Sequence, residues 1–429
     1  MKKTLALILL VCLLSIQVFN VYGIQRFPKP EFESGYVQPE THLPSPRAEI
    51  LAFLDIAVLI ISLSVVSWLV IKKRNRKAVF WMSVFSLLYF GFYREGCICS
   101  IGSIQNVTLA LFDKSYLIPL SAMIFFVAPL VYTLFFGRTF CAAVCPFGAL
   151  QDLVALSPQK IGSRLNAVLG VIPYIYLGLA VLYAATGTDF IICRYDPLVG
   201  IWRMEASFGM FLFGGILLVS GIFIARPYCR FLCPYGVLLN WVSRFSRKHI
   251  TITPSNCIQC RLCENSCPYE AIDMPLTDKN PDDKRTMGRK LIFITFLIPL
   301  LMFVGGWTAS KLHEPLASVN PKVRLAKQIL NPVSDKNQIE TFEISAFKSA
   351  GKPQSEAFSE AANVLKTFYT GSWILGSFLG LVFGALIAAR LITKHRTDYT
   401  PNKATCYSCV RCVDFCPVKP DGIQTENVK

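Results

Sequence analysis

Histidine and acidic residues are scarce in this chain, and their scarcity excludes several kinds of site. Among 429 residues there are 4 histidines and 27 Asp and Glu, against 43 Lys and Arg. No C-x-x-C-H motif occurs, so covalently attached haem is not expected. The sequence also has no glycine-rich phosphate loop and no Ser-His-Asp arrangement, so hydrolytic or nucleotide chemistry has no support. Cysteine occurs 16 times, so any metal chemistry must depend mainly on sulfur.

Eight of the cysteines form two copies of the pattern C-x2-C-x2-C-x3-C-P. This is the bacterial ferredoxin run, in which three closely spaced thiolates hold a cubane [4Fe–4S] cluster and the fourth ligates the cluster of the other run. Zinc sites usually pair two C-x2-C units or combine one with histidines, so the third cysteine and the proline argue against zinc. The spacing predicts one cluster on Cys257, Cys260, Cys263 and Cys416, and a second on Cys406, Cys409, Cys412 and Cys267.

Hydrophobic residues make up 53% of the chain and are gathered into long runs. Runs of about 20 apolar residues span a bilayer as helices, because only a helix satisfies its own backbone there. The net charge of +16 is distributed over short loops between the runs, as the positive-inside rule requires, which argues against a nucleic-acid surface. We expect spans at Ile50–Ile71, Ala78–Tyr93, Leu117–Gly137, Ala167–Gly187, Phe208–Ala225, Leu291–Trp307 and Trp373–Ile392.

The alternation of these spans predicts the side of the membrane on which each loop lies. The basic run Lys72–Lys77 is a strong cytoplasmic stop after the first of these spans. Both ferredoxin runs then lie on the cytoplasmic side of a bacterial inner membrane, where a reducing cytosol keeps thiolates free. Strand-like pieces at His249–Thr253 and Ala271–Met274 suit a compact ferredoxin fold, whose two halves are separated by a pair of membrane helices.

The predicted fold is mainly α: a polytopic helical membrane protein with a duplicated membrane unit and a small α+β ferredoxin domain for two clusters. The expected organisation is a signal peptide or first membrane helix over 1–23, a periplasmic segment over 24–49, the membrane domain over 50–248, the first ferredoxin half over 249–289, a membrane helix over 290–309, a periplasmic segment over 310–371, a membrane helix over 372–393 and the second ferredoxin half over 394–429.

The membrane domain contains an internal repeat with a constant offset of 88 residues. Arg138–Leu150 aligns with Arg226–Leu238, and each copy carries a C-x3-C-P motif after an inward-running helix. Proline suits the first helical position, so Pro146 and Pro234 should begin helices whose dipoles favour thiolate at the preceding cysteine. The repeat predicts a further metal or iron–sulfur site, and burial of cysteine as a small apolar residue is the plainer alternative. The four candidate ligands are Cys141, Cys145, Cys229 and Cys233.

Several residues in the segments expected on the outer side are weaker candidates. Cys97, Cys99 and Cys193 either hold a cofactor there or include a Cys99–Cys193 disulfide, since that compartment is oxidising. Ser355–Tyr369 has an apolar helical face that suits docking or packing. Asp55 lies near the outer end of its span, where snorkelling lowers the cost of a charge and a structural role is the plainer expectation.

The C-x3-C-P pairs on membrane helices, followed by two ferredoxin runs, resemble the NapH/NosR-type membrane polyferredoxins, which include the MauN-like proteins. The resemblance covers roughly residues 78–275 and 400–420. It implies an electron conduit between the quinol pool or cytoplasm and a periplasmic reductase system, with the eight ferredoxin cysteines as cluster ligands. NosR-like proteins carry a large flavin-binding periplasmic domain, and no segment here is long enough for one.

Together these features predict a membrane-bound iron–sulfur electron-transfer protein, an electron-transfer subunit or quinol dehydrogenase component rather than a stand-alone catalyst. The alternative is a redox-sensing regulator or maturation factor for a periplasmic reductase. Expected partners are the lipid bilayer, a cytoplasmic or quinol electron donor, and a periplasmic or membrane redox partner, with no nucleic acid. A solute transporter would leave the eight ferredoxin cysteines unexplained.

Overall fold

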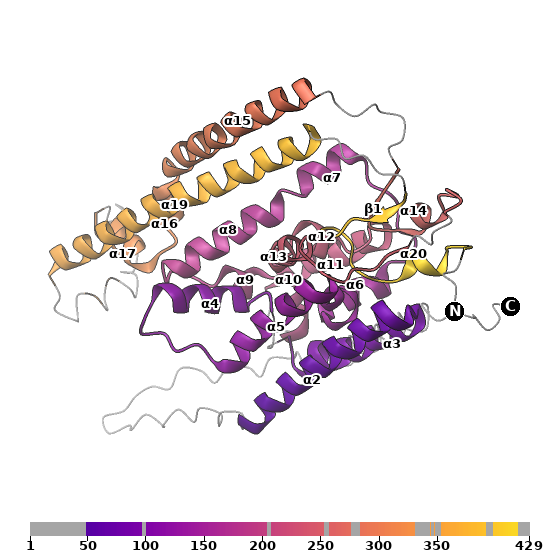
Figure 1. Cartoon of the computed structure of the whole chain (residues 1–429). Helices are drawn as coiled ribbons and strands as arrows, with labels where there is room; N and C mark the ends of the chain where they lie inside the picture. Colours follow the sequence, from indigo (N-terminus) through magenta and orange to yellow (C-terminus); the bar gives the residue numbers. More distant parts are fainter. Residues whose placement is uncertain are drawn as a thin grey trace.

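The computed structural model describes residues 49–96, 100–203, 207–252, 257–275, 284–330, 353–391 and 398–418, with the single residues 344 and 347. These ranges contain both C-x3-C-P motifs and both ferredoxin runs. The expectations for residues 1–48 and for Cys97 and Cys99 lie outside the described residues. Helices dominate the described chain, which also contains one two-stranded sheet (Figure 1).

Four helices of the described chain are long and apolar enough to cross a membrane: Ile50–Lys73, Arg164–Ala185, Arg285–Ser310 and Gln354–Leu391. The expected span at Leu117–Gly137 forms the shorter apolar helix α5 (Leu120–Phe136). The one at Phe208–Ala225 forms α11 (Phe208–Phe223), which reaches membrane length only together with the preceding helix, bent from it by 110°.

The described chain begins with a helical hairpin. α2 (Glu49–Trp68) continues into the π-helical turn η1 (Leu69–Lys73), and α3 (Arg76–Ser86) into η2 (Leu87–Tyr93). Asn75 caps α3, since its side chain accepts the Lys77 and Ala78 backbone N–H groups at 3.0 and 3.2 Å. α2 packs against α5, and α3 packs beside the first C-x3-C-P turn. The hairpin therefore covers one side of that cysteine motif.

Each copy of the membrane repeat has the same order of elements: short helical structure, an apolar helix, the C-x3-C-P turn and a helix begun by its proline. The first copy comprises α4 (Ser103–Phe112), α5, η3 (Phe140–Val144) and α6 (Pro146–Val154). The second comprises α9 (Ile191–Tyr195), α10 (Pro197–Arg203), α11, α12 (Pro227–Phe231) and α13 (Pro234–Ser243). The helix starts predicted at the two prolines are confirmed. Between the copies lie α7 (Ser163–Leu169) and α8 (Ile172–Ala185).

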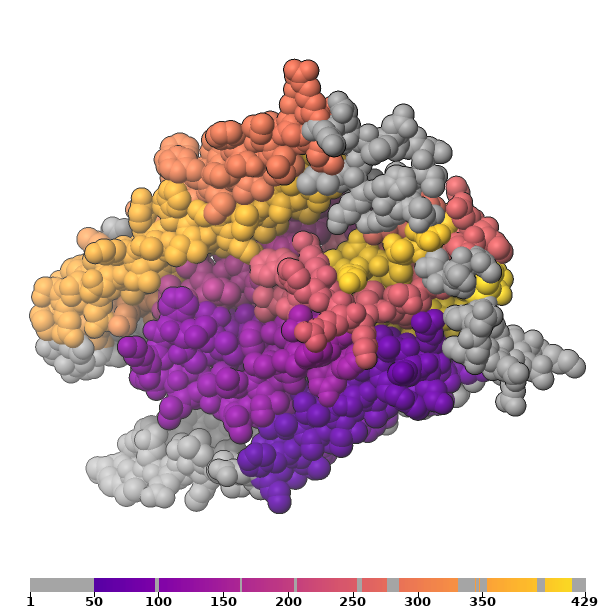
Figure 2. Space-filling view, viewed as in Figure 1, coloured from indigo at the N-terminus to yellow at the C-terminus, as the bar shows by residue number. Residues whose placement is uncertain are grey.

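Two long helices, α15 (Lys284–Ser310) and α19 (Gln354–Leu391), pack along each other on one flank of the molecule (Figures 1 and 2). Glycines allow the close approach, because a Cβ at Gly376 would collide with the carbonyl oxygen of Gly305. Between them in sequence come α16 (His313–Ala317) and α17 (Pro321–Leu330). In Figure 1, α16 and α17 lie at the end of the molecule opposite the ferredoxin elements.

The apolar face expected at Ser355–Tyr369 belongs to the first half of α19. Phe368 and Ala361 are buried there in a cluster with Val323 and Ala326 of α17 and Tyr183 of α8. Between docking and packing, the two roles considered for this face, the structure shows packing within the chain.

The two ferredoxin halves meet although α15 and α19 separate them in sequence. β1 (Ile272–Asp273) pairs antiparallel with β2 (Thr400–Pro401), and α14 (Leu262–Ser266) packs against α20 (Arg411–Asp414). The strand expected at Ala271–Met274 is therefore present in part. The strand expected at His249–Thr253 does not form over the described residues 249–252, where burial of Ile250 and Ile252 places the segment instead.

Candidate metal centres

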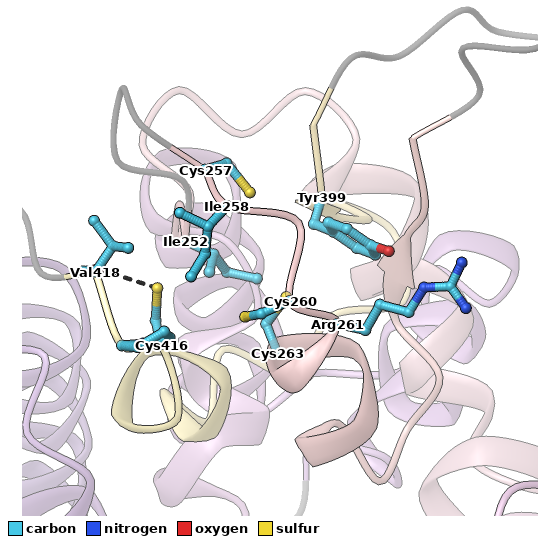
Figure 3. A pocket seen from close by; sticks show the side chains of 10 residues that line it. Ile252, Cys257, Ile258, Cys260, Arg261, Cys263, Tyr399, Cys416 and Val418 are labelled. Atoms are coloured by element: carbon cyan, nitrogen blue, oxygen red, sulfur yellow. Dashed lines mark hydrogen bonds between the residues drawn. The ribbon is translucent and has the colours of Figure 1, made fainter.

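One pocket is lined by cysteines from both ferredoxin runs. Cys257, Cys260 and Cys263 reach it from the loop before α14 and from that helix, while Cys416 reaches it from just beyond α20 (Figure 3). The Cys416 thiol donates to the Val418 carbonyl oxygen at 3.1 Å. Three cysteines of one run and the last cysteine of the other thus share this pocket, which is the grouping that the spacing predicts.

A second pocket contains the complementary set of cysteines. Cys406, Cys409 and Cys412 line it together with Cys267 and two aromatic residues, Tyr269 and Tyr407. Backbone N–H groups point at its sulfurs: Ser408 donates to Cys406 at 3.4 Å, and Ala271 donates to Cys267 at 3.5 Å. Such N–H···S contacts stabilise negative charge on sulfur and raise cluster potentials.

The same backbone turn orients the cysteines of both runs. Gln259 and Arg261 have φ values of 50° and 60°, and the corresponding Ser408 and Val410 have 53° and 65°. Non-glycine residues rarely adopt positive φ, and such strain concentrates at functional sites. Both runs therefore contain two residues in the left-handed conformation. A continuous helix or strand would instead point some of the cysteines away from the pocket.

The chemistry of these pockets fits an iron–sulfur cluster. Burial raises the pKa of the Cys406 thiol to about 12, because a thiolate there loses its hydration. Iron supplies the positive charge that allows such thiolates to form. No three His, Cys, Asp or Glu side chains of the described residues are arranged around a single metal ion. A cubane is wider than one ion, so its ligands stand further apart.

A third pocket lies between the two copies of the membrane repeat. It is lined by Cys141, Cys145, Cys229 and Cys233, together with Arg138 and two glycines. Polar groups point at the sulfurs: Gln151 Nε2 lies 3.2 Å from Cys229, and the Gly236 N–H donates to Cys233 at 3.3 Å. The repeat thus brings the four predicted cysteines together, and N–H donors aimed at sulfur distinguish this pocket from an ordinary apolar core.

A layer of aromatic and basic side chains joins the second and third pockets. The Tyr407 hydroxyl donates to the Cys229 carbonyl oxygen at 3.2 Å, and its ring lies 4.8 Å from that of Tyr269. The guanidinium groups of Arg138 and Arg226 lie 4.5 and 5.2 Å from the centre of the Tyr407 ring. We refer to these four residues as the bridging layer. It connects a ferredoxin run directly to the membrane cysteines.

A buried ion pair anchors this layer. Arg226 donates to Asp152 through Nε and Nη2 at 2.8 and 2.6 Å, and the Tyr269 hydroxyl donates to Asp152 at 2.8 Å. Burial opposes ionisation of Asp152, but Arg226 beside it holds the pKa of that carboxyl below its usual value. Sequence reasoning missed Asp152 and both tyrosines. The signal available was a carboxylate in an otherwise apolar stretch after the C-x3-C-P motif.

Of the candidate residues expected on the outer side, the structure describes Cys193 and Asp55. Cys193 is exposed, and its N–H lies 3.4 Å from Gln105 Oε1. Its expected partners Cys97 and Cys99 lie outside the described residues. Asp55 does not snorkel to solvent: it is fully buried, accepts the Tyr89 hydroxyl at 2.8 Å and pairs with Arg94 at 3.1 Å. Arg94, in the turn directly after the following hairpin helix, compensates its charge, so solvent is not needed.

Comparison with known families agrees with this arrangement. A family model described as a 4Fe–4S binding domain matches residues 118–164 and again 206–253, two matches that begin 88 residues apart. Each match contains one C-x3-C-P motif. A second 4Fe–4S binding domain model matches residues 249–272, which contain the first ferredoxin run. The chain therefore carries 4Fe–4S binding domains, and the duplication inferred from the sequence appears in the family matches.

Known relatives include NirI of Paracoccus denitrificans, 33% identical in an alignment of 171 positions that covers 35% of this chain and 24% of NirI. YccM of Escherichia coli, named a putative electron transport protein, is 29% identical in an alignment of 164 positions that covers 34% of this chain and 46% of YccM. NosR of Stutzerimonas stutzeri, named a regulatory protein, is 25% identical in an alignment of 209 positions that covers 44% of this chain and 28% of NosR. The chain is distantly related to these polyferredoxins.

This relationship confirms the resemblance to NosR-type proteins drawn from the cysteine motifs. The matched part of the chain spans less than half the length of each of these relatives. No solved structure matches the chain significantly. The chain is accordingly a ferredoxin-type iron–sulfur protein, related to a putative electron transport protein and to a regulator.

Proposed function

We propose that this chain is a membrane-bound iron–sulfur protein that transfers electrons between a cytoplasmic or quinol donor and a membrane or periplasmic redox system. The observation that carries the proposal is the succession of three four-cysteine pockets, of which the second and third are joined by the bridging layer. A storage or structural role would not require adjoining pockets, whereas electron transfer between cofactors requires them to lie close together.

In this proposal each pocket has a separate cofactor. Bound [4Fe–4S] clusters supply one-electron chemistry, and the eight ferredoxin cysteines would hold two of them. Cys141, Cys145, Cys229 and Cys233 would hold a further sulfur-ligated metal centre. The chain's own contribution is to fix the order of the pockets and to bury three of the four cysteines of the third, whereas Cys260 of the first is exposed. N–H donors to sulfur in the second and third pockets would adjust the potentials of those two sites.

The third pocket matters because of membrane thickness. A hydrocarbon core is about 30 Å thick, so cofactors at one face cannot serve the other without an intermediate. The ferredoxin elements lie at one end of the molecule and α16 and α17 at the other (Figure 1). The pocket formed by the membrane repeat extends the route from the ferredoxin end into the helical domain.

The experiment that tests the proposal is a cofactor inventory. The full chain is purified anaerobically from membranes, and iron and acid-labile sulfide are counted while EPR follows a redox titration. We expect two signals of reduced cubanes and a third, distinct centre. Two cubanes and no third centre would limit the chain to the ferredoxin end and contradict the proposed route.

A regulatory or maturation role is the second candidate, and the relationship to NosR, which is named a regulatory protein, favours it. The two functions separate in a cysteine variant such as Cys416→Ala. Loss of electron delivery to the partner reductase, with normal amounts of mature reductase, supports electron transfer. Loss of the mature reductase itself supports the regulatory or maturation role.

A further inference from the structure

The buried arginines of the two copies of the membrane repeat have different partners. Arg226 of the second copy is neutralised by Asp152 of the first, at 2.6 Å. With the offset of 88 residues, Arg138 is the counterpart of Arg226, and Asn240 is the counterpart of Asp152. An amide therefore stands where the symmetry of the repeat would place a carboxylate. Among the described residues, Arg226 has a carboxylate partner and Arg138 has none.

The packing shows that the two arginines are structural counterparts and not only aligned in sequence. A Cβ at Gly148 would lie 3.3 Å from Arg226 Nη1, and a Cβ at Gly236 would lie 3.5 Å from Arg138 Nη2. Gly148 and Gly236 are themselves 88 residues apart. Each arginine thus reaches across to the first turn of the helix that begins at the other copy's C-x3-C-P proline.

Arg138 is a buried cation without a carboxylate among the described residues. Its side chain donates to the Ala404 carbonyl oxygen at 3.2 Å and lies 3.9 Å from the Cys141 sulfur, while Nε has no hydrogen-bond partner in that part of the chain. The residue is 4% exposed. Asn240 Oδ1 is also buried, without a hydrogen-bond partner from any described residue. Because arginine cannot release its proton in a protein, this charge is permanent and must be compensated by an anion.

The position of Arg138 identifies where that anion belongs. Arg138 lines the pocket of the four membrane cysteines, whereas Arg226 does not. Four thiolates around a metal centre carry net negative charge, and a fixed cation beside them stabilises that charge. Asp152 neutralises Arg226, which does not line the pocket. Arg138, which does line it, has no such carboxylate among the described residues.

We propose that Arg138 is the counter-charge of an anionic, sulfur-ligated metal centre held by Cys141, Cys145, Cys229 and Cys233. Asn240 contributes because it places a neutral amide, and not a second carboxylate, at the position equivalent to Asp152. This inference deepens the proposed function, on which it depends. A fixed positive charge favours the state with one more electron, so it raises the reduction potential of the centre. The electron would come from a cluster held by Cys406, Cys409, Cys412 and Cys267, which would lose one electron. No bond forms or breaks, and no proton moves.

The test compares three variants of the anaerobically purified full chain by EPR-monitored titration and iron count. Asn240→Asp supplies the missing carboxylate, Arg138→Gln removes the charge, and Arg138→Lys retains it. We expect Asn240→Asp and Arg138→Gln to shift the potential of the third centre downward, or to reduce its iron content. Arg138→Lys should stay close to the wild type. Asn240→Asp is nearly isosteric, so it tests the charge even if Arg138→Gln does not fold.

The possible failures are distinguishable. A loaded third centre whose potential and iron content are the same in wild type, Asn240→Asp and Arg138→Gln would overturn the role of Arg138 and leave the proposed function intact. A wild-type chain that contains only two cubanes would contradict the third centre itself, and with it this role. The two ferredoxin clusters serve as internal references in every titration.

Discussion

The Tyr407 hydroxyl donates to the Cys229 carbonyl oxygen at 3.2 Å, so a residue inside the second ferredoxin run is bonded to a residue inside the second C-x3-C-P motif. The residues are 178 positions apart in the chain. Tyr407 directly follows Cys406, and its ring packs beside Arg138 and Tyr269. This contact links the second and third candidate cofactor pockets directly.

Substitutions at Tyr407 should separate the contribution of its hydroxyl to stability from that of its ring. Tyr407→Phe loses one hydrogen bond, which costs about 1 kcal/mol, and should retain all cofactors. Tyr407→Ala also loses a buried aromatic ring, which costs about 3–5 kcal/mol, and should lower the iron content. Thermal unfolding of the detergent-solubilised protein, with an iron count, measures both. Equal effects of the two variants would show that the ring does not support the layer.

Asp152→Asn should be among the most damaging single substitutions. It leaves Arg226, which is fully buried, without its counter-charge, and breaking such a pair costs about 3–5 kcal/mol. We expect a large fall in the thermal midpoint and loss of folded protein from the membrane. Asp113→Asn, the same change at an exposed loop position, is the matched control and should behave as wild type. A stable Asp152→Asn protein would refute the anchoring role of the pair.

Acidification should weaken the attachment of the ferredoxin half that starts at His249. Burial, with Lys403 nearby, lowers the pKa of His249 from 6.5 to about 4. Between these values the unfolded chain binds a proton that the folded chain does not, so stability falls as pH falls, by about 2 kcal/mol at pH 5. Unfolding midpoints between pH 7.5 and 5 measure this. His249→Gln should flatten the dependence, and an unchanged pH dependence in this variant would contradict the assignment to His249.

The α15–α19 pair should be intolerant of side chains at its glycine contact. A Cβ at Gly376 would meet the Gly305 carbonyl oxygen, so Gly376→Ala should force the helices apart at a cost of about 1–3 kcal/mol. Gly288 lies in α15 with nothing near its Cβ position, and Gly288→Ala should stabilise the helix by up to about 1 kcal/mol. The thermal midpoint is the measurement, and a tolerated Gly376→Ala would contradict the close contact.

The sequence predicted what depends on local spacing and failed where distant residues meet. Cysteine spacing gives the grouping of Cys267 with the second run, because the ferredoxin pattern itself implies the exchange. Proline position gives the start of α6 and α13. The bridging layer has no such signature, since its members come from the membrane repeat and from both ferredoxin runs.

Two partial failures have the same origin. A structural role was the plainer expectation for Asp55 and agrees with its burial, but its partner Arg94, just after the next hairpin helix, is a contact that hydropathy does not encode. The asymmetry between Asp152 and Asn240 lies two residues beyond the aligned segment, which ends at Leu150 and Leu238. The sequence contains this asymmetry, but the contact between Asp152 and Arg226 that gives it meaning is visible only in the structure.

The central claim is that electrons pass from the ferredoxin clusters through the pocket of the membrane cysteines. The most direct measurement uses vesicles that contain the purified protein and trapped ferricyanide, with dithionite added outside. We predict bleaching of the trapped ferricyanide by the wild type and none by Cys229→Ala, although the EPR signals of both ferredoxin clusters remain in the variant. Equal bleaching by wild type and variant, or none by the wild type with all three centres loaded, would contradict the account.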